Sequence, residues 1–326
     1  MTPPFGDTGS LLATSYPRVY GWNAKLTLAN LDIDLRRLWD KLPEPKLFVY
    51  LWNGAYQENS AATVSLLRAA IANLLGISPP IVAPPSAAAK PRRAHAALWC
   101  FLVTSVSSEA RAKLIHGQFW STPTVTFFAI PFAPQISRHL GAIENLTFSA
   151  DDQAEVQKLI RDTILASPPV GAHIHSHNQD PDALWKLTNS IDVKPLPMLE
   201  KGGAPKLVWN VYADPPSSNL SSHEDWRRTF LEMKFVTALH GVGKPKCLSG
   251  CTGCKSTDHP TGLCPFPKIE GSFARPSSTS IQSLIPTSLE LPHMQRATRG
   301  RGSRGRGANS GQRGRSRGRG SPAPFP

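Results

Sequence analysis

The sequence predicts an α+β protein built from a βαββαβ domain, a second α+β domain, a small metal-binding segment and a disordered C-terminal segment. Apolar alternation and helical stripes follow one another up to residue 246, which predicts strands and helices in two groups. Beyond them, three of the five cysteines gather around a histidine, and the chain then becomes rich in arginine and glycine. We therefore divide the 326 residues into segments 1–45, 46–134, 135–246, 247–268 and 269–326.

Charge is distributed unevenly along the chain. The net charge is +13, nine arginines lie between Arg296 and Arg319, and no acidic residue follows Glu290. These nine arginines account for all but +4 of the charge, so the basic end predicts a polyanionic partner. The N-terminus has no secretory-signal pattern, and no apolar run is long enough to span a bilayer. The odd number of cysteines favours reduced thiols over disulfides. We therefore expect an intracellular protein, in the nucleus or the cytoplasm, without a membrane partner.

The first domain follows a short predicted helix at residues 34–42. Ser60 is the expected N-cap of its longer helix, and Gly76 is the expected stop. The predicted segments are, in order, a strand at 46–54, a helix at 60–75, a short strand at 79–85, a strand at 96–106, a helix at 107–117 and a strand at 122–132. This β-α-β-β-α-β order is the split-βαβ, ferredoxin-like pattern.

The second domain shows a weaker version of the same pattern. Ser149 and Asp152 form a capping box before an amphipathic helix, and Ser222 opens a later helix that we expect Gly241 to stop. The other predicted segments are strands at 140–148, 170–177 and 205–213 and a short helix at 182–191. We interpret this order as a second, incomplete copy of the first domain.

The segment from Cys251 to Cys264 has the spacing C-x2-C-x4-H-x4-C, in which Cys254 is the second cysteine and His259 the histidine. Three thiolates and one imidazole form a closed tetrahedral Zn²⁺ shell, which leaves no open position for catalysis. So short a segment has no core of its own, and the metal must supply its folding free energy, on the order of 10 kcal/mol. The alternatives are a chance cluster, or Cys247 as a ligand in place of Cys251.

These four ligands resemble a zinc knuckle of the CCHC type, which is found in nucleocapsid proteins of retroviruses and retrotransposons. The resemblance implies a module that binds single-stranded nucleic acid through an apolar cleft. Thr252 stands where the family commonly has an aromatic residue and Asp258 where it has a glycine, while Leu263 and Phe266 are near. The alternative is a zinc clip that only joins segments of the chain.

The first strand of the βαββαβ domain divides its side chains between two faces. Leu47, Val49 and Leu51 point one way and can fill the face that packs against the helices, and the aromatic residues point the other way. This pattern resembles an RNA-recognition motif, whose central strands stack bases on exposed aromatic rings. The alternative is that the second domain covers these rings. The resemblance implies a nucleic-acid-binding face made of Phe48, Tyr50, Trp52, Trp99 and Phe101.

A recognition motif, a CCHC knuckle and a basic tail, in this order, resemble the nucleic-acid-binding proteins encoded first in LINE-type retrotransposons, and Gag-like proteins more broadly. Residues 223–241 and 258–267 also resemble CCHC proteins of mushroom-forming fungi. Arginines that alternate with glycine can contact phosphate or stack on bases. The candidate contacts in the tail are Arg299, Arg301, Arg304, Arg306, Arg313, Arg315, Arg317 and Arg319.

His173, His175 and His177 form the best enzymatic pattern in the chain. Alternation on a strand puts all three on one side, and the pattern resembles the histidine-triad nucleotide hydrolases, although Ser176 replaces an apolar spacer. The alternative for these histidines is a solvated strand end. A second enzymatic pattern, a phosphate-binding P-loop, is excluded because residues 241–246 lack its glycine spacing.

The sequence therefore predicts a non-enzymatic protein that holds one structural Zn²⁺ and binds single-stranded nucleic acid. RNA is the expected ligand, single-stranded DNA is the alternative ligand, and self-association is left open. The alternative functions, in order, are a structural or assembly protein whose zinc module only orders the C-terminal part, and a histidine-triad-like nucleotide hydrolase.

Overall fold

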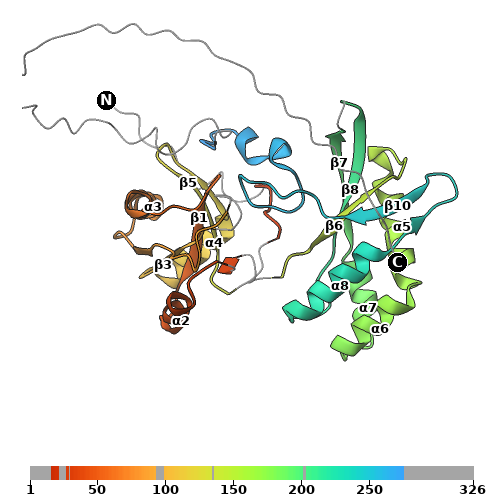
Figure 1. Cartoon of the computed structure of the whole chain (residues 1–326), viewed down its shortest axis with the longest axis horizontal. Helices are drawn as coiled ribbons and strands as arrows, with labels where there is room; N and C mark the ends of the chain where they lie inside the picture. The colour runs from red at the N-terminus through yellow and green to blue at the C-terminus, as the bar shows by residue number, and fades with distance from the viewer. Residues whose placement is uncertain are drawn as a thin grey trace, which may run out of the picture. The chain divides into compact units, whose positions relative to one another are not determined.

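The computed structural model describes residues 16–21, 27–28, 30–92, 99–133, 136–200 and 203–274. Its strands are β1 (Leu47–Leu51), β2 (Ile81–Ala83), β3 (Phe101–Thr104), β4 (Phe119–Ser121), β5 (Thr126–Pro131), β6 (His139–Glu144), β7 (Asp192–Leu199), β8 (Pro205–Tyr212), β9 (Phe235–Val236) and β10 (Val242–Lys246) (Figure 1). Its α-helices are α2 (Ile33–Lys41), α3 (Ala61–Leu75), α4 (Ser108–Gly117), α5 (Gln153–Leu165), α6 (Pro168–His177), α7 (Ala183–Asn189) and α8 (Leu220–Glu232). Within these residues, no helix has the length and apolar content needed to cross a membrane.

The strands form two antiparallel sheets of five strands with the same strand order, and with the helices they make an α+β fold, as the sequence predicts. The first sheet has the order β2-β3-β1-β5-β4, and the second has the order β7-β8-β6-β10-β9. Helix α3 connects β1 to β2, and helix α4 connects β3 to β4. In the second sheet, α5, α6 and α7 connect β6 to β7, and α8 connects β8 to β9. The second half is therefore a complete copy of this strand order, where the sequence predicts an incomplete one.

Local signals start and end several helices where the sequence predicts. Helix α3 begins after Ser60, although the Ser60 side chain makes no capping hydrogen bond, and it ends at Gly76, whose φ of 64° is a left-handed conformation that glycine adopts without strain. Ser107 Oγ accepts a hydrogen bond from Ala110 N at 3.1 Å at the start of α4. The capping box at residues 149–152 forms as expected, and it begins the turn η1 (Ala150–Asp152) that precedes α5.

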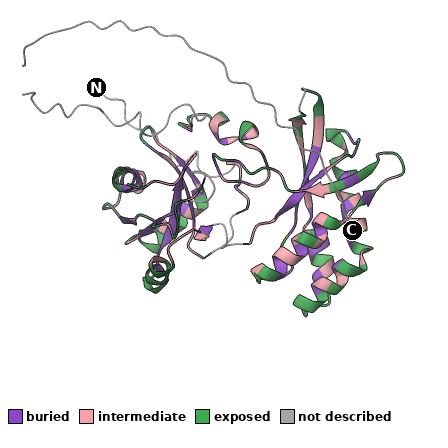
Figure 2. Cartoon of the chain, in the orientation of Figure 1, coloured by how far each residue is buried: buried purple, intermediate pink, exposed green. Residues whose placement is uncertain are grey.

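Helices α5 to α8 bury one continuous apolar core against the second sheet. The stripe Val156, Ile160 and Ile164 of α5 is 0% exposed, and so are Trp226 and Phe230 of α8. These side chains belong to one cluster with inward residues of β6, β7 and β8. In Figure 2 these helices are buried on one side and exposed on the other, while β7 and β10 are mostly intermediate or exposed.

Residues 170–177 form most of helix α6, so the predicted strand at this place is wrong. Pro168 and Pro169 occupy the first turn of the helix, where a missing N–H costs no intrahelical hydrogen bond. Val170 and Ile174 lie four residues apart, and both are 0% exposed. Burial therefore follows the helical period and not the alternation of the histidines.

Strands β4, β7, β9 and β10 are elements that the sequence analysis does not predict. Strand β7 contains Pro195 and Pro197, but it is an edge strand that pairs only with β8, where proline is tolerated. Helix α8 ends at Glu232, and Gly241 takes a φ of 82° between β9 and β10, so the predicted helix to Gly241 is wrong.

The predicted disordered segment 269–326 overlaps the described residues at 269–274. Ala274 is 3% exposed, and Phe273 N donates to Ser121 Oγ at 2.8 Å, so the end of this short stretch contacts the fold, contrary to the expectation. Residues 275–326 lie outside the described residues. The predicted tail contacts therefore remain predictions: Arg299, Arg301, Arg304, Arg306, Arg313, Arg315, Arg317 and Arg319.

Lys46 stabilises the C-terminal end of α2 from inside the fold. Its Nζ donates to the carbonyl oxygens of Trp39, Asp40 and Leu42 at 2.9, 3.1 and 2.8 Å, and the residue is 4% exposed. A cation at this end also interacts favourably with the helix dipole.

We expect Lys46→Met to lower the free energy of unfolding by about 2–3 kcal/mol, because three carbonyl groups lose a charged donor. Lys41→Met is the matched control, since it removes an exposed lysine from the same helix end, and it should change this free energy by less than about 1 kcal/mol. Urea unfolding followed by circular dichroism measures both variants. Equal losses would contradict the capping role of Lys46.

Candidate metal centre

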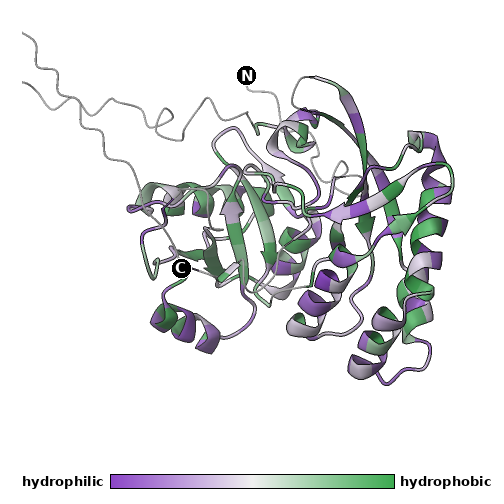
Figure 3. Ribbon diagram, turned by 45° about the vertical axis from the view of Figure 1, so that its right-hand side comes forward, coloured by the Kyte–Doolittle hydropathy of each residue, from purple (hydrophilic) through white to green (hydrophobic). Residues whose placement is uncertain are grey.

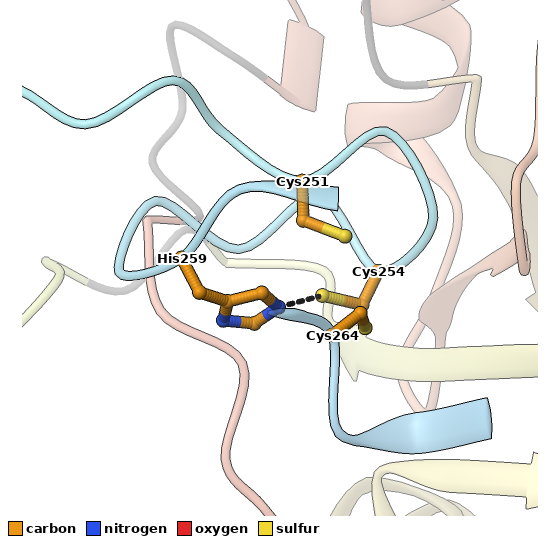
Figure 4. Close-up of side chains that lie close together, drawn as sticks. All are labelled: Cys251, Cys254, His259 and Cys264. Atoms are coloured by element: carbon orange, nitrogen blue, oxygen red, sulfur yellow. Dashed lines mark hydrogen bonds between the residues drawn. The ribbon is translucent and has the colours of Figure 1, made fainter. Parts of the chain in front are cut away.

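Cys251, Cys254, His259 and Cys264 lie together, as their spacing predicts. One sulfur or nitrogen atom from each residue lies within 4.8 Å of the corresponding atoms of the others, and all four residues are buried. Their side chains point toward one another in Figure 4, and Cys254 Sγ lies 3.4 Å from His259 Nε2. The four side chains are therefore placed to hold one metal ion in a closed shell.

Backbone hydrogen bonds build a tight turn around the first two cysteines. Lys255 N donates to the Cys251 carbonyl oxygen at 3.0 Å, and Cys251 N donates to the Ser256 carbonyl oxygen at 2.8 Å. Lys255 takes a φ of 64°, which turns the chain so that Ser256 N donates to Cys254 Sγ at 3.4 Å. Burial raises the pKa of the Cys254 thiol, and an N–H that points at the sulfur acts in the other direction by favouring the thiolate, which is the form that binds metal.

The second half of the segment returns through Pro260 and the turn η2 (Thr261–Leu263) to deliver Cys264. Thr252 N donates to Thr261 Oγ1 at 2.9 Å, which ties the two halves together. Thr252 stands at the position where the resemblance expects a base-stacking aromatic residue. In this chain the side chain at that position has its Oγ1 atom 3.1 Å from Thr261 Oγ1.

Asp258 holds the imidazole of His259 in a defined orientation. His259 Nδ1 donates to Asp258 Oδ1 at 2.6 Å, which leaves Nε2 to face the cysteines. Burial alone would raise the pKa of Asp258, but hydrogen bonds from His259 and Ser256 hold this pKa below its usual value. Tyr212 OH donates to Asp258 Oδ2 at 3.0 Å, and burial raises the pKa of Tyr212, so the hydroxyl keeps its proton.

The first sheet and the N-terminal segment hold residues 251–266 from one side. Tyr50 OH donates to the Cys254 carbonyl oxygen at 2.9 Å, and Asn53 N donates to the Gly253 carbonyl oxygen at 2.9 Å. Phe266 is 0% exposed and packs on the rings of Phe119 and Phe128, with centroids 4.7 and 4.9 Å away. The backbone of Tyr20 adds hydrogen bonds to residues 256 and 257.

The second sheet contacts the same segment through a buried polar network. Asn210 Nδ2 donates to the Asp258 carbonyl oxygen at 2.8 Å, and Asn210 Oδ1 lies 3.2 Å from His139 Nε2. His139 Nδ1 lies 2.9 Å from Thr257 Oγ1. Burial lowers the pKa of His139 to about 4, so the neutral ring donates through Nε2 and accepts through Nδ1. Each of these buried polar groups therefore has a partner.

The expected open aromatic face does not exist in the described structure. Phe48, Tyr50 and Phe101 are at most 1% exposed, Trp99 is 6% exposed, and Trp52 is half-buried. The strands of the first sheet are mostly hydrophobic in Figure 3. A base cannot stack on rings that are already covered, so the prediction of a stacking surface is wrong for the four buried rings.

The cover of this face also differs from the expectation. Phe48 and Tyr50 share one apolar cluster with Trp39 of α2 and with Cys254 and Phe266, so the N-terminal segment and the metal-ligating segment cover the face. Phe101 pairs with Val49 across the sheet, which places it on the opposite, helix-facing side. Trp99 packs against Tyr56, with ring centroids 4.9 Å apart.

The other candidate residues from the sequence do not join a site. His173 and His177 lie one turn apart on α6 with ring centroids 4.5 Å apart, His175 lies on another side of the helix, and each of the three places a ring nitrogen near a backbone carbonyl oxygen. Within the described residues, the Cys251–Cys264 cluster is the one group of metal-ligating side chains. Cys247 is exposed and lies outside it, and Arg227 Nη2 lies 3.3 Å from its sulfur.

Sequence reasoning misses four residues that position the ligands: Asp258, Tyr212, Asn210 and His139. Asp258 stands next to a ligand, which is the one signal in the sequence that could have singled it out. Tyr212 and Asn210 are 46 and 48 residues from their partner Asp258 along the chain, and His139 is 118 residues from its partner Thr257, so only folding brings them together.

No protein-family model, no curated protein and no solved structure matches this chain.

Gly253 gives a test of how closely the segment fits the first sheet. A Cβ atom at this position would lie 2.4 Å from Cη2 of Trp52, closer than atoms can approach. We expect Gly253→Ala to lower stability by about 1–3 kcal/mol, because the ring and the turn must separate. Gly262→Ala is the matched control, since nothing lies within 4 Å of its added Cβ. Thermal unfolding measures both, and equal melting temperatures would contradict this packing.

Proposed function

We propose that Cys251, Cys254, His259 and Cys264 hold a structural Zn²⁺, and that the chain is a single-stranded nucleic-acid-binding protein whose expected ligand is RNA. The observation that carries the zinc proposal is the convergence of three sulfurs and one imidazole nitrogen within 4.8 Å. This donor set suits zinc, because thiolate and imidazole together in a tetrahedral arrangement are its usual ligands. A closed shell gives the metal a structural role.

The hydrogen bonds around the ligands support the role of a clip. Residues 251–266 contact Tyr20 near the N-terminus, Tyr50 in the first sheet and Tyr212 in the second. Zinc would fix the conformation of this segment, and the segment would then join three separate parts of the chain. These contacts support the alternative to a nucleic-acid-binding knuckle, which is a zinc clip that joins segments of the chain.

The strand order supports a likeness to the RNA-recognition motif. The order β2-β3-β1-β5, with α3 and α4 as connections, is the one that a split βαββαβ unit is expected to have. Since the aromatic face of the first sheet is covered, we place the nucleic-acid contacts elsewhere on the chain. The likeness to Gag-like proteins rests on the order of a recognition-motif-like domain, a CCHC segment and a basic tail along the chain.

Charge supports nucleic acid as the partner. The net charge is +13, and nine arginines without an acid lie between Arg296 and Arg319. Such a segment attracts polyanions through the release of counterions, whatever their sequence.

The second candidate function is that of a structural or assembly protein. The observation that favours it is the burial of all four ligands, which leaves little of the centre to touch a partner. Nucleic-acid binding that persists after removal of the tail would argue against this candidate.

We expect the purified protein to hold one zinc ion per chain. Cys254→Ser and His259→Ala should each abolish zinc retention, because three ligands cannot close the shell. Cys247→Ser is the matched control and should keep the metal, since this thiol is exposed and outside the cluster. Elemental analysis after dialysis against a weak chelator measures the metal. Full retention in a Cys251, Cys254 and Cys264 triple serine variant would refute the site.

We expect deletion of the residues after Gln295 to make nucleic-acid binding less sensitive to salt. Each phosphate neutralised on a single strand contributes about −0.7 to the slope of log affinity against log salt. If about half of the nine arginines engage at once, the slope should flatten by about 3. Fluorescence anisotropy across a salt series measures this change, and elemental analysis should show that zinc is retained. Equal slopes before and after truncation would show that the tail makes no contact.

A further inference from the structure

A groove of about 250 Å³ lies between helices α5 and α7, on elements that the metal centre does not use. Trp185 of α7 and Leu165 of α5 line it, and they are 61% and 42% exposed. Within the described residues, Trp185 is the one strongly exposed tryptophan. An exposed indole that borders a groove offers an open ring face on which another flat ring can stack.

Two cations share the groove with this indole. Arg161 Nη2 donates to the Asn189 carbonyl oxygen at 3.0 Å, which holds the guanidinium at the wall between the two helices. Lys158 pairs with Asp162, but both side chains are exposed, at 77% and 57%. An exposed pair of this kind contributes little, so Lys158 can exchange the carboxylate for an incoming phosphate.

We propose that the α5–α7 groove binds a nucleotide of a single-stranded nucleic acid, with the base stacked on Trp185 and the phosphate held by Lys158 and Arg161. An aromatic platform beside basic side chains is the arrangement that binds single strands without sequence preference. The excess of positive over negative charge in the groove complements a phosphate. This proposal rests on the proposed function, and it adds a contact that the arginine-rich tail does not provide.

The shape and chemistry of the groove favour a nucleotide over a protein partner. The stable docking of a protein needs an extended apolar surface with a polar rim. Here the exposed apolar side chains in the groove are Trp185 and Leu165, and charged or amide side chains make up much of the rest. One ring beside two cations matches one base and its phosphate.

The test uses the full-length, zinc-loaded chain and a fluorescein-labelled oligouridylate of about 20 nucleotides, with anisotropy as the readout. Measurement at about 0.3 M salt weakens the electrostatic contribution of the tail and leaves stacking in place. Trp185→Ala should weaken binding roughly 5- to 100-fold, and Trp185→Phe should restore most of the affinity because its ring still stacks. Quenching of tryptophan fluorescence by the RNA should be reduced in both variants.

Two matched controls separate the groove from general surface effects. Leu239→Ala removes another exposed apolar side chain, 86% exposed, and should bind like wild type. Lys158→Gln should weaken binding more than Lys113→Gln, which removes an exposed lysine from α4. Melting temperatures should stay the same in all variants, because these side chains are exposed.

Each outcome decides between the two proposals. If wild type does not bind the oligouridylate, the proposed function fails and the groove proposal fails with it. If wild type binds and Trp185→Ala binds equally well, the groove proposal alone is wrong, and the groove serves another partner or none. If Leu239→Ala weakens binding as much as Trp185→Ala, the effect is not specific to the groove, and the proposal is again wrong.

Discussion

The hydrogen bonds of Asp258 and Cys254 join the ligand cluster to both sheets. Asp258 orients His259 through one carboxylate oxygen and accepts the Tyr212 hydroxyl through the other, while the Cys254 carbonyl oxygen accepts the Tyr50 hydroxyl. A segment this short buries too little apolar surface to fold alone. The conformation of residues 251–266 therefore depends on the ligand cluster and on the two sheets. In return, these residues cover the aromatic face of the first sheet.

That covering constrains where function can reside. The apolar side chains of Phe48, Tyr50 and Phe128 form one cluster with the ligating cysteines and Phe266. The same rings cannot both stabilise the fold by burial and stack on bases, because each use needs the same ring faces. A nucleic acid would have to bind at other surfaces, such as the groove that Trp185 borders.

The two sheets share a strand order but differ in the face that lies away from their helices. In the second sheet this face carries polar and charged residues, among them Asn210, Lys206 and Glu144, and Lys206 Nζ donates to Glu144 Oε2 at 2.9 Å. Asn210 and Tyr212 at one end of it provide the hydrogen bonds to Asp258. The ligating segment therefore packs on the first sheet mainly through apolar contacts and on the second mainly through polar ones.

The sequence by itself determined the features that depend on neighbouring residues. The ligand spacing from Cys251 to Cys264, the Gly76 stop and the capping box at residues 149–152 follow from contacts within a few residues, which sequence patterns record directly. Only the tertiary structure decided that β7 accepts prolines as an edge strand, that residues 170–177 are helical, that Asp258 reaches Tyr212, and that the aromatic face is covered. These features depend on which distant segment lies against each element, and alternation along one strand shows which residues share a face but not what covers that face.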